Sequence, residues 1–110
     1  MAIYAVDFDG TLSLTDHNLV ILKPNAPLIR NMINQQRQGN KVILWTCRCG
    51  KALDDAVNWC KDQGLIFDAV NDNVPEMIEK FGENSRKIFA DYYIDDKNQT
   101  FHVPYNWYYD

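Results

Sequence analysis

Four short apolar runs, each separated from the next by a stretch with helical spacing, constrain this 110-residue chain more than any other feature. The runs cover residues 3–8, 41–45, 67–70 and 92–94, and their β-branched and aromatic residues are typical of strands. Strands that are apolar almost throughout and alternate with helices predict right-handed crossovers and a mainly parallel sheet. The predicted fold class is a doubly wound α/β domain with helices on both faces of the sheet.

The segments between these runs carry the helix signals. Apolar residues at positions 28, 29, 32 and 33 predict a first helix between Pro27 and Gly39, and those at 53, 56, 57 and 60 predict a second that ends at Gly64. A shorter third helix is expected from Pro75 to the loop at Gly82. Residues 12–24 have room for a short hairpin only. Residues 1–110 therefore form one domain, which is large enough to bury a core without disulfides.

Charge and cysteine usage narrow the function classes. The net charge of −4 disfavours nucleic acid as a partner, although a local basic patch would offset it. The sequence has neither a basic leader with an apolar core nor a long uncharged apolar window, so we expect a cytoplasmic protein with no membrane contact. Three cysteines without a second pair or neighbouring histidines indicate reduced thiols and not a zinc site.

Polar residues that suit phosphate and metal follow the predicted strands. Asp7 and Asp9 follow the first run, Thr46 the second and Asp95 the fourth. Ligands bind at the carboxyl ends of parallel strands, so these side chains should meet at one edge of the sheet. Two aspartates so close together repel each other unless a cation neutralises them, and Asp95 would complete an oxygen site of the kind that Mg²⁺ prefers. An Asp-x-Asp at a strand end is also a common Asx turn, so this pair alone leaves both interpretations open.

The same residues carry a resemblance to a known family. Residues 7–12, Asp-Phe-Asp-Gly-Thr-Leu, resemble the first motif of the haloacid dehalogenase-like hydrolase superfamily. Thr46, Lys87 and the pair Asp95-Asp96 resemble the second, third and fourth motifs, in the same order along residues 3–96. The resemblance implies a Rossmann-like core and Mg²⁺-dependent hydrolysis of a phosphomonoester.

Roles for the catalytic and phosphate-binding residues follow from this resemblance. It implies that Asp7 is the nucleophile and forms an aspartyl-phosphate. Asp9 would act as general acid and then as general base, with a pKa raised by its crowded surroundings. Thr46, Lys87 and the backbone N–H groups of residues 9–11 would hold the phosphoryl group.

The resemblance also implies a metal site, and it gives no role to Arg48. Asp7, the carbonyl of Asp9 and Asp95 would bind Mg²⁺, with Asp96 contacting the ion through water or supporting the ligands. Arg48 follows Thr46 by two residues, and we expect its planar donor fork at the mouth of the site, on a second phosphate or a carboxylate of the substrate.

Family members commonly carry a cap domain over the site, and this chain has no room for one. An open site fits a phosphate displayed on a large molecule, as in the similar capless phosphatase domains of polynucleotide kinases, or a site closed by a second copy of the chain. The aromatic segment 101–109 is either a dimer contact, a base-stacking platform or part of the core. Three functions stay open: a phosphatase for small esters, a nucleic-acid end phosphatase, and a slow regulatory module that binds metal and phosphate.

Overall fold

A four-stranded parallel sheet forms the centre of the protein. The computed structural model describes residues 1–98. The strands are β1 (Ile3–Val6), β4 (Lys41–Leu44), β5 (Ala69–Val70) and β6 (Tyr92–Ile94), and they lie side by side in the order β5-β4-β1-β6. Every pair of neighbours is parallel. The predicted α/β class with a mainly parallel sheet is confirmed.

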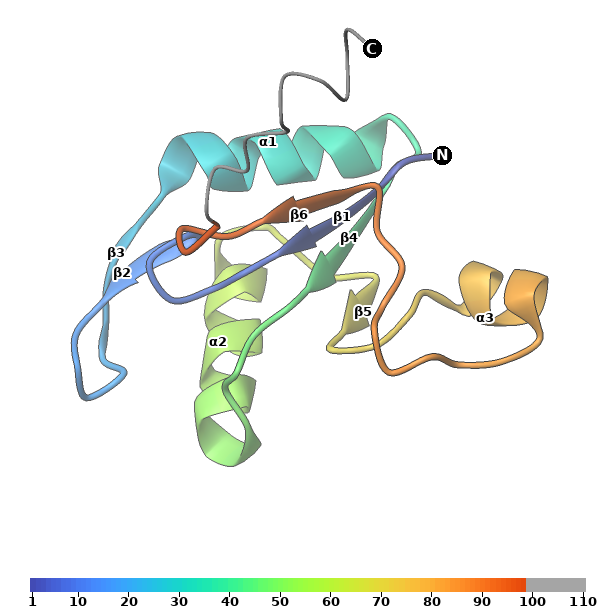
Figure 1. Ribbon diagram of the computed structural model, residues 1–110. Helices are drawn as coiled ribbons and strands as arrows, with labels where there is room; N and C mark the ends of the chain where they lie inside the picture. Colours follow the sequence, from blue (N-terminus) through green and yellow to red (C-terminus); the bar gives the residue numbers. More distant parts are fainter. Residues whose placement is uncertain (99–110) are drawn as a thin grey trace, which may run out of the picture.

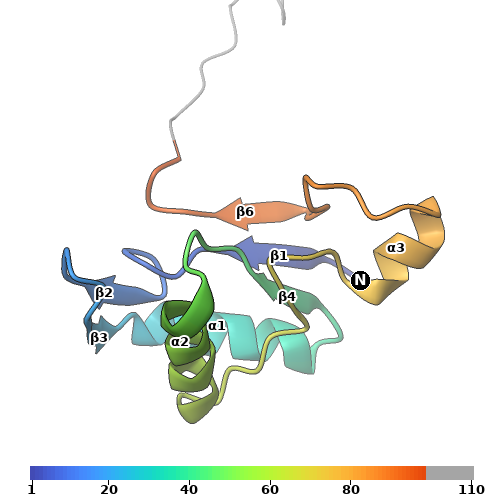
Figure 2. The ribbon, with the colours of Figure 1, turned by 90° about the horizontal axis from the view of Figure 1, so that it is seen from below.

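Helices cover both faces of this sheet (Figures 1 and 2). Helices α1 (Ala26–Arg37) and α2 (Gly50–Asp62) pack on one face, and α3 (Pro75–Phe81) packs on the other. The first core contains Val6, Phe8, Leu12, Ile29, Met32, Val42, Leu44, Ala56, Cys60 and Leu65. The second contains Ile3, Ala5, Ile43, Val74, Ile88 and Ala90. Successive strand residues alternate between the two cores, and therefore the strands are apolar almost throughout.

Local signals set the helix ends much as the sequence predicts. The Asn25 side chain accepts a hydrogen bond from the Leu28 N–H at 3.4 Å and caps α1. Gly39 follows α1 with a φ of 88°, and Gly82 ends α3 with a φ of 75°. Such positive φ values favour glycine, which explains why the helical patterns stop there.

The strands are shorter than the apolar runs that predict them. β5 has only two residues, although residues 67–70 are apolar apart from Asp68. The Asp68 carboxylate accepts the N–H of Val42 at 2.8 Å, and the Asp68 N–H donates to the Val42 carbonyl at 2.8 Å. The paired residues of β4 and β5 are Ile43 with Ala69 and Leu44 with Val70.

The segment after β1 forms the expected hairpin, with β2 (Ser13–Thr15) antiparallel to β3 (Ile21–Pro24). In both views it lies at the end of the molecule towards which the arrows of β1 and β6 point, opposite α3 (Figures 1 and 2). Within residues 1–98 the structure contains no cap domain, since segment 71–86 holds only α3 and a loop. None of the helices in this part of the chain is long and apolar enough to cross a membrane. The aromatic segment 101–109 lies outside the described residues.

Candidate active site

The topology brings the ends of β1 and β6 together. Val6 pairs with Ile94, so Asp7 and Asp95 are the next residues on two adjacent strands. The chain continues from β1 to α1 on one face, whereas it reaches β6 from α3 on the other. The crevice between such strands is the usual ligand site of an open α/β sheet, and therefore this edge is where a site is expected.

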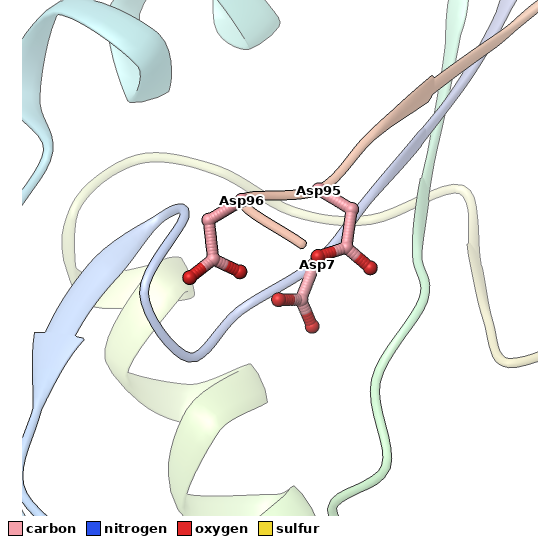
Figure 3. A group of neighbouring side chains, drawn as sticks. All are labelled: Asp7, Asp95 and Asp96. Atoms are coloured by element: carbon pink, nitrogen blue, oxygen red, sulfur yellow. The ribbon is translucent and has the colours of Figure 1, made fainter. Parts of the chain in front are cut away.

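Three carboxylates gather at this point. One oxygen each of Asp7, Asp95 and Asp96 can be chosen so that all lie within 4.8 Å of one another. Figure 3 shows Asp7 at the end of β1, and Asp95 and Asp96 after β6, with their carboxylates close together. Asp7 and Asp95 are half-buried, and Asp96 is exposed. The sequence predicts Asp7 and Asp95 as metal ligands and Asp96 only as an indirect or supporting contact. In the structure the Asp96 carboxylate belongs to the cluster in the same way as the other two.

The electrostatics of Asp7 reflect this crowding. Burial raises the pKa of the Asp7 carboxyl, and the nearby charges of Asp95 and Asp96 raise it further. Hydrogen bonds from the Phe8 N–H and the Thr11 hydroxyl act in the opposite direction without restoring the ordinary value. The ionised form of Asp7 is therefore disfavoured until a cation offsets the negative charge.

Thr11 links two members of the cluster. Its hydroxyl lies 3.3 Å from Asp7 Oδ2 and 3.5 Å from Asp96 Oδ1 and accepts the Asp96 N–H at 3.2 Å. Asn25 donates its side-chain N–H to the Thr11 carbonyl at 2.9 Å and so connects this turn to the start of α1. From the sequence alone, Thr11 is as consistent with an ordinary turn residue as with a residue that supports the site. Its contact with Asp96 in the structure favours the supporting role.

Gly10 allows Asp96 to approach. Its φ is 78°, and a methyl group added there would collide with the Asp96 carboxylate. We expect Gly10→Ala to lower the free energy of unfolding by about 2–3 kcal/mol, since it adds a collision to the cost of a positive φ. Gly82→Ala is the matched control, because Gly82 has a similar φ of 75° and no neighbour at that position. Urea unfolding of both variants checks this, and equal losses would show that Asp96 has room to move.

Arg48 lies elsewhere than the sequence predicts. It is 6% exposed and does not face the mouth of the site. Its Nε donates to Asp9 Oδ2 at 3.1 Å and its Nη2 to Asp9 Oδ1 at 2.8 Å. The expectation that its donor fork binds substrate is wrong for this structure, because two edges of the guanidinium already contact the protein.

The ion pair also corrects the expectation for Asp9. Burial raises the pKa of the Asp9 carboxyl, but the hydrogen bonds and the positive charge of Arg48 outweigh it and hold that pKa below its ordinary value. The Asp9 side chain is absent from the cluster formed by Asp7, Asp95 and Asp96. Its carboxylate is therefore kept ionised and apart from the other three.

Thr46 lies where the sequence predicts it. A cavity of about 270 Å³ is lined by Asp7, Trp45, Thr46, Cys47 and Asp95. The Thr46 N–H donates to the Asn71 side chain at 2.8 Å, and its hydroxyl oxygen accepts the Arg48 N–H at 3.2 Å. The hydroxyl proton of Thr46 therefore stays available to a ligand beside Asp7.

Lys87 and the turn after β1 fit the predicted roles less closely. Lys87 lines an adjoining cavity of about 350 Å³ that shares Trp45 and Asp95 with the first, and its Nζ lies 6.0 Å from the centre of the Tyr93 ring. The structure thus places Lys87 in a cavity that Asp95 also lines, and not in the cavity of Asp7.

Two of the expected backbone donors are already used. The Gly10 N–H donates to the Ser13 carbonyl at 2.8 Å, and the Thr11 N–H donates to the Phe8 carbonyl at 3.2 Å. The expectation that these N–H groups bind phosphate is wrong, because the hairpin that starts at Ser13 folds back over the turn.

Comparison with known proteins places the chain in a family but assigns it no activity. A solved structure described as a conserved protein from Bacteroides thetaiotaomicron is 34% identical, and the match covers 98% of this chain and 86% of that one with a TM-score of 0.76. The chain belongs to the family of that conserved protein. Comparisons with models of protein families and with curated proteins gave no match. The name of the Bacteroides protein states no activity or ligand, so membership of this family establishes the fold and leaves the chemistry to the side chains described above.

Proposed function

We propose that the protein is a Mg²⁺-dependent phosphohydrolase of the haloacid dehalogenase-like type, which cleaves a phosphomonoester through an aspartyl-phosphate on Asp7. One observation carries the proposal: the carboxylates of Asp7, Asp95 and Asp96 lie within 4.8 Å of one another where β1 and β6 end. The cavity beside Asp7, with the Thr46 hydroxyl in its wall, has room for a phosphoryl group.

The donor set fits a small hard cation. All three side chains offer carboxylate oxygens, which Mg²⁺ prefers. Burial, and after it the charges of Asp95 and Asp96, raise the pKa of Asp7. Asp7, Asp95 and Asp96 would hold the ion, with the Asp9 carbonyl as a further ligand. A bound Mg²⁺ supplies charge neutralisation to the carboxylates and to the phosphate oxygens.

The side chains themselves account for the reaction. A carboxylate oxygen of Asp7 attacks phosphorus and the bond to the ester oxygen breaks, which leaves the phosphoryl group on Asp7. The leaving group departs as an alkoxide or phenolate and takes its proton from solvent water. The Thr46 hydroxyl donates to a phosphoryl oxygen, and Lys87 approaches from the adjoining cavity. Asp9, held ionised by Arg48, suits the second step as general base. It takes a proton from a water molecule whose oxygen bonds to phosphorus, while the bond from phosphorus to Asp7 breaks and inorganic phosphate leaves.

Magnesium binding should be visible without turnover. At a free concentration about 100 times its Kd, Mg²⁺ should stabilise the folded state by roughly 2.7 kcal/mol, which raises Tm on the order of 10 °C relative to EDTA. Asp95→Asn should remove most of this shift because it removes one of the three clustered carboxylates, whereas Asp62→Asn at the exposed end of α2 should retain it. Equal shifts in all three proteins would place the ion elsewhere.

The direct test of the proposed function is hydrolysis of 4-nitrophenyl phosphate by the wild type in Mg²⁺, in EDTA, and in EDTA followed by excess Mg²⁺. We expect phosphate release in the first and third conditions only. Release that is equal in EDTA would overturn the metal requirement, and no release from this ester or from a panel of small phosphate esters would overturn the phosphohydrolase.

A slow regulatory module is the second candidate, and the Arg48–Asp9 ion pair is the observation that favours it. With both Asp9 oxygens engaged by a guanidinium, protonation of a leaving group by this side chain is disfavoured. Such a module predicts Mg²⁺-dependent binding of orthophosphate with no turnover. Calorimetry of orthophosphate binding alongside the hydrolysis assay separates the two candidates.

The open site also bears on partners and location. Without a cap among residues 1–98, the site suits a small ester or a phosphate displayed on a larger molecule, and a second copy of the chain is a further means of covering it. A nucleic-acid end would be the less favoured substrate at a net charge of −4, and its cleavage should fall steeply with salt. The exposed thiols of Cys47 and Cys49 support a reducing compartment such as the cytoplasm.

A further inference from the structure

The Arg48 guanidinium joins the turn after β1, the hairpin loop and the first turn of α2. Besides Asp9, it contacts the Ala52 carbonyl in α2 through Nη1 at 3.1 Å and the Leu19 carbonyl through Nη2 at 2.9 Å. Its Cζ lies 4.8 Å from the centre of the Phe8 ring, and its side chain is 3% exposed. These contacts surround the buried, planar guanidinium and hold it in a single position.

A single nitrogen binds both the hairpin and the carboxylate. Nη2 of Arg48 donates to Asp9 Oδ1 at 2.8 Å and to the Leu19 carbonyl at 2.9 Å. The two acceptors therefore cannot move apart without the loss of one charge-assisted hydrogen bond.

The hairpin loop around Leu19 is itself a fixed unit. The Leu19 N–H donates to the Asp16 carbonyl at 3.0 Å, and the N–H groups of Asn18 and Val20 donate to the Asp16 side chain at 2.8 and 3.0 Å. Leu19 adopts a φ of 64°, which a leucine adopts only when its surroundings impose it. A displacement of this loop consequently carries the Leu19 carbonyl with it.

The loop is also placed to meet a substrate or partner. Leu19 and Val20 are 47% and 51% exposed, and they lie in the connection between β2 and β3, which begins seven residues after Asp9. Contact on these apolar side chains would act on the backbone that Arg48 binds.

We propose that Arg48 is a positioning residue that couples the hairpin loop 16–20 to the Asp9 carboxylate, so that the body of the substrate, by contacting the loop, sets the position of the general base. The catalytic part of this inference rests on the proposed phosphohydrolase function, whereas the mechanical coupling does not. Arg48 thus determines how the rate depends on the substrate beyond its phosphate group.

Kinetics test the catalytic part. We expect Arg48→Lys, which keeps the charge and loses the planar fork, to lower kcat about tenfold or more while KM changes less than about threefold. In an Asp9→Ala background the same change should cost nothing further, since Arg48 acts through Asp9. Lys51→Met is the control, because the Lys51 side chain is 88% exposed and, within residues 1–98, pairs only with Asp55 across one helical turn. Losses that add in the double variant would overturn the positioning role.

Hydrogen exchange tests the coupling without any turnover. Asp9→Ala should accelerate exchange of the Leu19 and Val20 amides at least about fivefold, as Arg48→Lys should, while Lys51→Met leaves both unchanged. Asp9→Asn, which keeps one acceptor, should give a smaller change of the same sign and serves if the alanine variant fails to fold. Unchanged hairpin exchange in both Asp9 variants would overturn the coupling. If the variants accelerate exchange as expected but the wild type cleaves no phosphate ester, only the proposed phosphohydrolase function is rejected and the coupling stands.

Discussion

Asp7→Asn is expected to lower kcat for Mg²⁺-dependent phosphate release by about 10⁴-fold or more, as removal of a covalent nucleophile does in other enzymes. The amide keeps the size of the side chain and lacks the oxygen nucleophile, so the loss should appear in kcat at saturating substrate. Initial rates of phosphate release from 4-nitrophenyl phosphate measure it. A variant that keeps more than about a tenth of the wild-type rate would show that Asp7 does not form the intermediate.

The same substitution, Asp7→Asn, should raise the stability of the folded protein although it lowers activity. Because the pKa of Asp7 is raised in the folded protein, its ionised form is a source of instability above that pKa, and the penalty disappears as the pH falls through it. At neutral pH in EDTA, Asp7→Asn should therefore have a higher Tm than the wild type, whereas Asp62→Asn should not. A lower Tm would mean that the loss of activity reflects damage to the fold.

Arg48→Met should have the largest effect on stability, a loss of about 3 kcal/mol and a fall in Tm on the order of 12 °C. Methionine preserves the stem of the side chain, but Asp9 then loses its cation and the Leu19 and Ala52 carbonyls lose their donors. Urea unfolding at pH 7 measures the loss. Lys51→Met, which breaks an exposed pair 3.0 Å long, should cost about 0.5 kcal/mol or less.

Acid should remove most of this difference. The pKa of Asp9 is lowered by Arg48, so the stability that the pair contributes is present above the ordinary pKa of an aspartate and is lost as the pH falls through the lowered value. The gap between wild type and Arg48→Met should therefore narrow only at pH values below about 4. A constant gap down to pH 2 would assign the loss to packing on Phe8 and to the hydrogen bonds with the Leu19 and Ala52 carbonyls, and not to the ion pair.

Much of the fold follows from local patterns. The alternation of apolar strands with helical spacing predicts the order of the elements, and Asn25, Gly39 and Gly82 set helix ends that the structure confirms. The two-residue β5 is shorter than its four-residue apolar run, and Asp68 bonds Val42 through both its N–H and its side chain. No pattern within residues 67–70 predicts these contacts, since the partner lies 26 residues away.

The site is predictable in its residue types and less so in its contacts. Asp7, Thr46 and Asp95 follow strands and meet as parallel topology requires. The sequence predicts Arg48 at the mouth of the site and misses its burial, because the acceptors that bury it belong to the hairpin and to the first turn of α2. The direct place of Asp96 in the cluster likewise depends on the absence of a side chain at Gly10. Contacts of this kind depend on residues that are neighbours only in the folded protein, so the periodicity of the sequence does not predict them.

The pairing of β1 with β6 also determines when the acidic cluster can form. Asp7 and Asp95 are 88 residues apart in the numbering of the chain, and they meet only after β6 docks on β1. Contacts of such long sequence separation carry a high loop-closure entropy and tend to form late in folding. An ion bound by this cluster would then have little effect on the folding rate and would slow unfolding instead. Metal at this site would therefore protect the protein chiefly by prolonging the lifetime of the native state, with little help to a nascent chain before β6 has emerged.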